Sequence, residues 1–201
     1  IDDISWVANA YSNHEVMSFC ADYSLWNISD DPAETDSHVF LQHLKIQYGD
    51  LSFQHAYFFH TNFAIEDVQI CRGNLSLTDS QLIQSSVTIS HVECSGNRYQ
   101  HPAISFAGCH ADHSVLKLHS CVNQMKLDLS RADMKTSRFY LEDDDASALE
   151  EVCFDQSHVE EITLSKMKID HFYARQLQVK CLRLDQCTIA DSSVVFANVD
   201  T

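Results

Sequence analysis

The sequence predicts an all-β fold, a right-handed parallel β-solenoid with a short helical N-terminal cap. Hydrophobic residues recur every five positions in the C-terminal part of the chain, and a second, smaller set stands two positions before them. The 201 residues include only 4 glycines and 2 prolines, which is too few for a fold rich in tight hairpins. We therefore expect strands that follow one another around successive coils.

The five-residue period is clearest after residue 130. Fourteen positions separated by five residues contain a single non-hydrophobic residue, Asp144, whereas a composition of 45% hydrophobic residues predicts about six hydrophobic positions. These centres are Met134, Phe139, Asp144, Leu149, Phe154, Val159, Leu164, Ile169, Ala174, Val179, Leu184, Ile189, Val194 and Val199. A helix cannot keep such a period on one face, because each residue rotates it by about 100°.

The smaller set supports an extended backbone, because residues i and i−2 of a strand lie on one face. Each step thus offers a large and a small side chain to the interior, and four steps close one square coil. The members of the smaller set are Ala132, Ser137, Ser147, Ser157, Cys187, Ser192 and Ala197.

Residues 41–201 form the predicted solenoid, which we expect to be irregular or looped at about 93–128, where Gly96 and Pro102 occur. Residues 1–40 lack the period and are expected to form the helical cap and its connection, with Asp2 or Asp3 capping the first helix. The period continues to Val199, which indicates a piece of a longer protein or a homodimer through the C-terminal coil.

The composition excludes several partners and sites. With 13 Lys and Arg residues against 29 Asp and Glu residues, the net charge of −16 disfavours direct binding of nucleic acid or of anionic membranes. It fits either simple solubility or an acidic surface that attracts a basic partner. The 8 cysteines include no C-x-x-C pair, so we expect reduced core residues of a cytosolic compartment.

A coil of twenty residues would stack acidic side chains into a stripe, because residues twenty apart would lie on neighbouring strands about 4.8 Å apart. Glu150 would lie below Asp170, and Glu151 below His171 and Asp191. We expect this stripe of Glu150, Glu151, Asp170 and Asp191 to be a binding surface for a basic protein partner.

The densest polar cluster offers four candidate zinc ligands, Cys109, His113, His119 and Cys121. Its spacing matches no common zinc finger, and strand alternation would send neighbouring members to opposite faces. We expect core thiols and surface histidines there, with no metal and no cofactor. No nucleophile elbow, phosphate loop, dinucleotide fingerprint or H-E-x-x-H motif is present, so the sequence indicates a non-catalytic protein.

A large apolar centre with a small residue two positions earlier resembles the pentapeptide-repeat family, whose consensus is A-(D/N)-L-x-x. Ala132-Asp133-Met134 and Ala197-Asn198-Val199 fit that consensus closely. The resemblance implies a right-handed square β-helix that binds other molecules, such as the solenoid ahead of the catalytic part of bacterial HECT-like ubiquitin ligase effectors. The sequence departs from the family through bulky residues at i−2, which are Met167, Phe172, Leu177 and Leu182.

Three functions remain as hypotheses. The first is a protein-interaction module of a larger bacterial protein, either cytoplasmic or secreted into a host cytosol as an effector. The second is an acidic DNA mimic that binds a topoisomerase or another DNA-binding protein through its negative face. The third is a solenoid enzyme or metal protein, which would need polar side chains that converge in one cleft.

Overall fold

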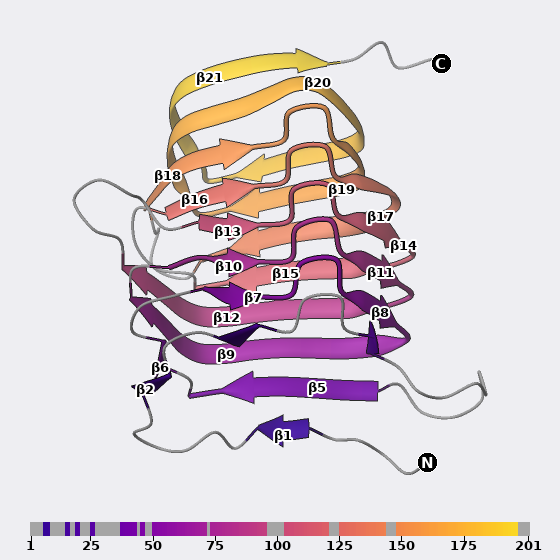
Figure 1. Cartoon of the computed structure of the whole chain (residues 1–201). Helices are drawn as coiled ribbons and strands as arrows, with labels where there is room; N and C mark the ends of the chain where they lie inside the picture. Colours follow the sequence, from indigo (N-terminus) through magenta and orange to yellow (C-terminus); the bar gives the residue numbers. More distant parts are fainter. Residues whose placement is uncertain are drawn as a thin grey trace.

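The computed structural model confirms an all-β, parallel β-solenoid of about six turns (Figure 1). Every pairing between strands is parallel, and each links a strand to the turn below or above it. The described parts of the chain contain no helix, and therefore none that could cross a membrane. The structure describes residues 6–8, 15–16, 19–20, 25–26, 37–43, 45–46, 50–71, 73–95, 103–120, 125–143 and 148–196.

The strands stack into two broad walls and a narrow wall at one end of the cross-section. The first wall contains β1 (Trp6–Ala8), β5 (Ser37–Gln42), β9 (Thr61–Cys71), β12 (Ser86–Ser95), β15 (Val115–His119), β17 (Asp133–Glu142), β19 (His158–Ser165) and the second half of β20 (Lys168–Asp185). At its far edge β2 (Glu15–Val16) and β6 (Lys45–Ile46) pair in line with β9.

The second wall lies opposite and consists mostly of short strands. It contains β3 (Phe19–Cys20), β7 (Leu51–Ser52), β10 (Leu75–Ser76), β13 (Ala103–Ser105), β16 (Met125–Asp128), β18 (Ala148–Cys153), the first half of β20 and β21 (Thr188–Phe196). The narrow wall contains β4 (Leu25–Trp26), β8 (Tyr57–Phe59), β11 (Gln81–Ile83) and β14 (His110–Asp112), and continues into β17, β19 and β20.

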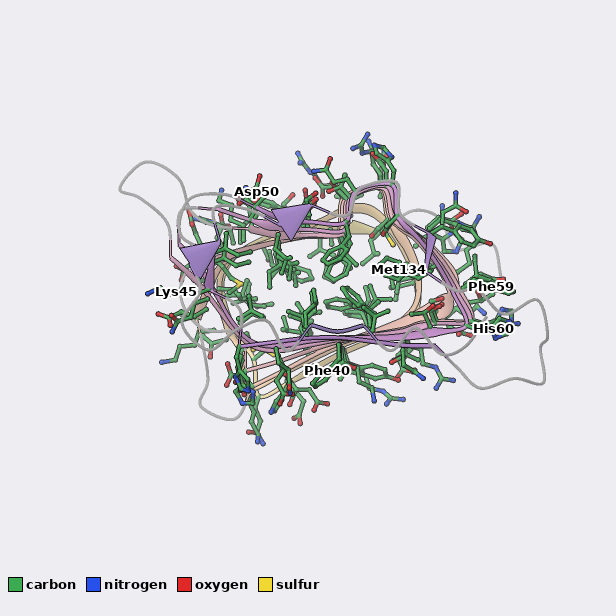
Figure 2. All side chains as sticks on the ribbon, turned by 60° about the horizontal axis from the view of Figure 1, so that its bottom comes forward. Phe40, Lys45, Asp50, Phe59, His60 and Met134 are labelled. Atoms are coloured by element: carbon green, nitrogen blue, oxygen red, sulfur yellow. The ribbon has the colours of Figure 1, made fainter. Side chains whose placement is uncertain are left out.

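The turns differ in length, unlike the uniform twenty-residue coil that the sequence predicts. Successive partners on the second wall are 24, 29, 23 and 25 residues apart, from Leu51 through Leu75, Ile104 and Leu127 to Val152. Only the last two turns, from Val152 through Phe172 to Ser192, have the predicted twenty residues. The earlier turns contain an extra corner and longer connections, which flatten the cross-section (Figure 2).

The apolar core fills the space between the walls, and the predicted centres occupy it. Figure 2 shows apolar side chains, among them Met134, directed inward, while Lys45 and His60 point away from the interior. In the last turns the buried positions alternate in steps of two and three, so the predicted pairing of large and small residues holds there. They are Val152, Phe154, Ser157, Val159, Ile162, Leu164, Met167, Ile169, Phe172, Ala174 and Leu177. Burial then decreases, and Leu184, Val194 and Val195 are 44%, 39% and 55% exposed.

The corners depend on left-handed backbone rather than on glycine. Among the described residues, Gly108 and fourteen non-glycine residues have positive φ, and seven of the fourteen are His or Asp, which adopt this conformation more readily than most. These residues recur at equivalent corners on successive turns, such as His43, Asp67 and His91. At Gly108 a β-carbon would collide with the carboxylate of Asp79 on the previous turn.

One corner of the wider turns contains a buried column of hydroxyls, formed by Thr61, Ser85, Ser114 and Ser137. The backbone N–H of Thr61 donates to Ser85 Oγ at 3.1 Å, that of Ser85 to Ser114 Oγ at 3.0 Å, and that of Ser114 to Ser137 Oγ at 2.9 Å. Ser114 Oγ in turn lies 2.9 Å from the carbonyl oxygens of Leu82 and Asp112. These side chains therefore supply the acceptors that the backbone ladder lacks at this corner.

Two predicted segments fall largely outside the described residues. Within residues 1–36 only the short strands β1 to β4 are described, so the helical cap stays a prediction. Residues 96–102 and 121–124 also lie outside the described part of the chain. Between them, β13, β14 and β15 continue the three walls, with Phe106, Ala111 and Leu116 buried in the core.

Candidate functional site

The predicted zinc ligands do not come together. Cys109 is fully buried in the core, where burial raises the pKa of its thiol to about 12. His113 lies at an exposed corner and contacts Asp112, whereas His119 lies at the end of β15 on the first wall. Cys121 lies outside the described residues. In the part of the chain that the structure describes, no group of three or more His, Cys, Asp or Glu residues is arranged to hold a metal ion.

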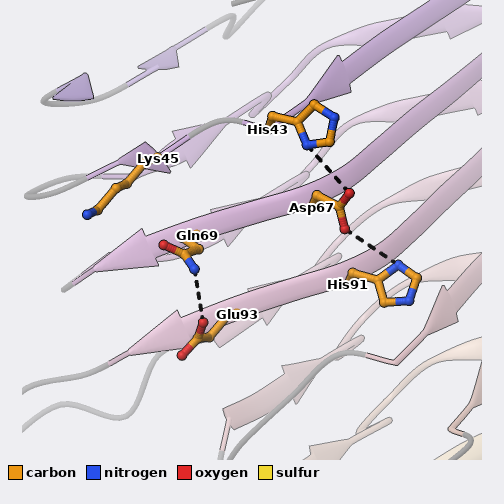
Figure 3. A pocket seen from close by; sticks show the side chains of 6 residues that line it. All are labelled: His43, Lys45, Asp67, Gln69, His91 and Glu93. Atoms are coloured by element: carbon orange, nitrogen blue, oxygen red, sulfur yellow. Dashed lines mark hydrogen bonds and ion pairs between the residues drawn. The ribbon is translucent and has the colours of Figure 1, made fainter. Parts of the chain in front are cut away.

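A polar groove follows one corner of the wider turns, beside the first wall (Figure 3). It has a volume of about 310 Å³ and is formed by three residues at left-handed corners and three residues two positions later. These six residues are His43, Asp67, His91, Lys45, Gln69 and Glu93.

The side chains of this groove contact one another across the turns. His43 Nδ1 lies 3.5 Å from one carboxylate oxygen of Asp67, and His91 Nδ1 lies 3.8 Å from the other. Gln69 Nε2 donates to Glu93 Oε2 at 3.3 Å. The groove thus alternates donors and acceptors at the spacing of the turns, which suits a polar guest but provides no activated nucleophile. The spacing of 24 residues between its histidines and Asp67 was the sequence signal for it.

The predicted acidic stripe lies on the second wall, near its C-terminal end. The strand register places Glu151 against His171 and His171 against Asp191, and the neighbouring pair of Leu149 and Ile169 places Glu150 beside Asp170. The four acidic residues therefore lie within three adjacent strands, β18, β20 and β21.

Cations interrupt this stripe. Lys126, one turn below, forms a 3.0 Å ion pair with Glu151, and His171 Nδ1 lies 3.5 Å from Asp191. Glu151 is the largest cause of the raised pKa of Lys126. The column that runs from Lys126 to Asp191 thus alternates in polarity, so this part of the second wall is a mixed charged surface rather than a purely acidic one.

An exposed row of three side chains crosses the stripe along β20. His171, Tyr173 and Arg175 lie two residues apart and point outward, because strand side chains alternate between faces. The rings of His171 and Tyr173 are nearly parallel, with an interplanar angle of 5° and centroids 6.2 Å apart. Arg175 Cζ lies 5.8 Å from the centroid of the Tyr173 ring. We call His171, Tyr173 and Arg175 the aromatic row.

Arg175 is held in place by the turn below. Its backbone N–H and its Nε each donate to the carboxylate of Asp155 at 2.7 Å, and its Nη2 contacts the same carboxylate. Desolvation raises the pKa of Asp155, but the hydrogen bonds and charge of Arg175 outweigh it and lower the pKa below its usual value. The pairing fixes the guanidinium beside Tyr173.

The sequence stage identified the stripe but missed the aromatic row. The signal was present in residues 168–177, where inward Ile169, Phe172, Ala174 and Leu177 alternate with outward polar residues. Tyr173 and Arg175 are residue types that often contribute most to binding at protein interfaces.

Comparisons with known proteins give no match. No protein-family model fits the chain, and no curated protein is similar enough to count as a relative. The assignment of function therefore depends on the residues and their geometry.

Proposed function

We propose that this chain is a non-catalytic protein-interaction module that binds a protein partner through the C-terminal part of its second wall. The aromatic row carries the proposal, because a Tyr ring between an imidazole and a fixed guanidinium offers apolar contact, hydrogen bonds and charge in one place. These side chains stand on strands that are paired on both sides, so little conformational freedom is lost on binding.

The finer proposal is a pentapeptide-repeat-like domain of a larger bacterial protein, such as an effector that acts in a host cytosol. The two last turns support it, since they have twenty residues each and a regular alternation of buried positions. The longer turns below them depart from that pattern.

Site-specific photo-crosslinking tests the interaction surface. A photoreactive phenylalanine analogue is placed at Tyr173 on the second wall or, as a matched control, at Tyr140 on the first wall. Each protein is incubated with bacterial and with eukaryotic lysates, and the adducts are identified by mass spectrometry. We expect one defined protein to be linked at position 173 and not at 140. Equal labelling at both positions would contradict the proposal.

The net charge of −16 favours a second candidate, the DNA mimic, whose partner would be a topoisomerase or another DNA-binding protein. Purified DNA gyrase provides the test. Inhibition of supercoiling that decreases with salt, and that is lost when Glu150, Glu151, Asp170 and Asp191 are changed to Lys, would support it. The control changes Glu142 and Asp185 of the first wall to Lys.

A further inference from the structure

The ring of Tyr173 stands above short neighbours. The residues paired with it on the adjacent turns are Cys153 below and Ser193 above. Adjacent parallel strands lie about 4.8 Å apart, so these short side chains leave space along both edges of the ring. A partner's side chain can therefore lie against Tyr173 without displacing residues of the wall.

Carboxylates border the same space. Asp191 lies one turn above His171 and is 70% exposed, and Glu151 lies one turn below it. Asp155 and Asp170 are close by in sequence and register. A guest beside Tyr173 and His171 thus meets aromatic faces and acidic oxygens together, a setting that favours a planar cation over an anion.

Arg175 shows which cation this setting accepts. Its guanidinium lies beside the Tyr173 ring and is bonded to Asp155, so one arginine of the chain already combines the two contacts. Guanidinium groups pack on aromatic faces and bind carboxylates through two parallel hydrogen bonds, which an ammonium group cannot do.

We propose that the part of the aromatic row formed by Tyr173 and His171, together with Asp191 and Glu151, is a receptor for an arginine side chain of the protein partner. This inference rests on the proposed function and names the chemistry of the partner. The guest guanidinium lies against the Tyr173 ring on the side away from Arg175, and its N–H groups donate to the carboxylates of the neighbouring turns.

The test is an NMR titration of the full chain with three short capped peptides. They have the same glycine-containing frame and differ at one central residue, which is arginine, lysine or citrulline. Citrulline keeps the planar shape of arginine without its charge. We expect the arginine peptide to shift the signals of Tyr173 and His171 and to bind several times more tightly than the lysine peptide, while the citrulline peptide gives no saturable shift.

Variants separate the ring from general charge. Tyr173→Leu is expected to weaken the arginine peptide about tenfold and Asp191→Asn to weaken it less, whereas Tyr173→Phe retains binding. Tyr140→Leu, on the first wall, is the matched control and leaves binding unchanged. Equal binding of arginine and lysine, or equal binding by wild type and Tyr173→Leu, would overturn the receptor.

The outcomes also distinguish this inference from the proposed function. If crosslinking at position 173 captures a partner but the arginine peptide neither binds nor competes, the interaction surface stands and the arginine receptor is wrong. If a maltooligosaccharide binds at Tyr173 and the arginine peptide does not, the row is a carbohydrate platform and the receptor is also wrong. If position 173 captures nothing specific, the proposed function fails by itself.

Discussion

Single residues at the corners accept a conformation that most side chains avoid. Gln176 has a φ of 60°, whereas Gln178, two residues later on the same strand, has ordinary extended backbone; both are exposed. The left-handed conformation costs an L-residue about 1–2 kcal/mol, and glycine avoids most of that cost. The scarcity of glycine therefore means that this chain tolerates local strain at many corners.

Glycine substitution at these two glutamines should have opposite effects. Gln176→Gly is expected to raise the free energy of unfolding by up to about 1 kcal/mol, because relief of strain outweighs the added entropy of the unfolded chain. Gln178→Gly is expected to lower it by about 1 kcal/mol, because glycine weakens an extended strand. Urea denaturation measures both, and destabilisation of equal size by both variants would show that the corner is not strained.

Cys109 should make the fold sensitive to alkaline pH. Its pKa is 9.0 in an ordinary setting and about 12 in the folded chain, where burial disfavours the thiolate. Since the folded-state pKa is raised, the neutral thiol stabilises the fold below pH 9, and this contribution is lost as pH rises from about 9 towards 12.

The comparison is with Cys109→Ala, which places at this position the residue found at the equivalent positions Ala56 and Ala132. Other groups ionise equally in both proteins, so the difference between their unfolding free energies isolates the thiol. We expect wild type to lose stability relative to the variant between pH 9 and pH 11, as followed by denaturant titration. Parallel curves would contradict the burial of the thiol.

Among the elements of the fold, the hydroxyl column explains how a corner can be both buried and irregular. The sequence predicts small inward residues at Ser85 and Ser137, and the structure buries both. Their role as acceptors for the next turn could not be predicted, because a serine pattern alone does not specify which backbone N–H lacks a carbonyl partner.

Ser114 is the best position to test this column. Ser114→Ala would leave the backbone N–H of Ser85 buried without its acceptor, and we expect a loss of about 1–3 kcal/mol in the free energy of unfolding. Ser114→Thr keeps the hydroxyl, as Thr61 does in the same column, and should recover most of the loss. The matched control is Ser90→Ala, a half-buried outward serine of β12, which should change stability by less than about 0.5 kcal/mol. Equal effects of the two alanine variants would refute the role of the column.

For the whole molecule, the five-residue period was sufficient to predict the parallel solenoid. The period fixes which side chains face inward, and the centres from Met134 to Ala174 that the structure describes are all buried. It could not predict turn lengths, because connections with no inward residue can lengthen without altering the period elsewhere. The register of Glu151, His171 and Asp191 could be predicted because those turns have twenty residues, whereas the contribution of Lys126 depends on a longer turn.

The last described turn motivates a proposal about assembly. Leu184, Val194 and Val195 are substantially exposed, and within the described residues no strand pairs with the outer edge of β21. We propose that a second copy of the chain covers this surface.

Sedimentation velocity across a wide range of concentration should then show a monomer–dimer equilibrium. Leu184→Glu combined with Val195→Glu is expected to shift it to the monomer, whereas Val115→Glu on the first wall has no effect. A wild-type chain that is monomeric at every concentration would contradict the dimer.

The unequal turns have a consequence for recognition. In a perfectly periodic solenoid, a partner that fits one turn also fits the turn above and below, so its position along the rod is degenerate. Here the spacing in sequence changes from 29 to 20 residues along the stack, and so does the set of side chains displayed at each level. Each level of the rod therefore has its own address, and a partner that recognises one of them cannot slide by a turn without losing its contacts.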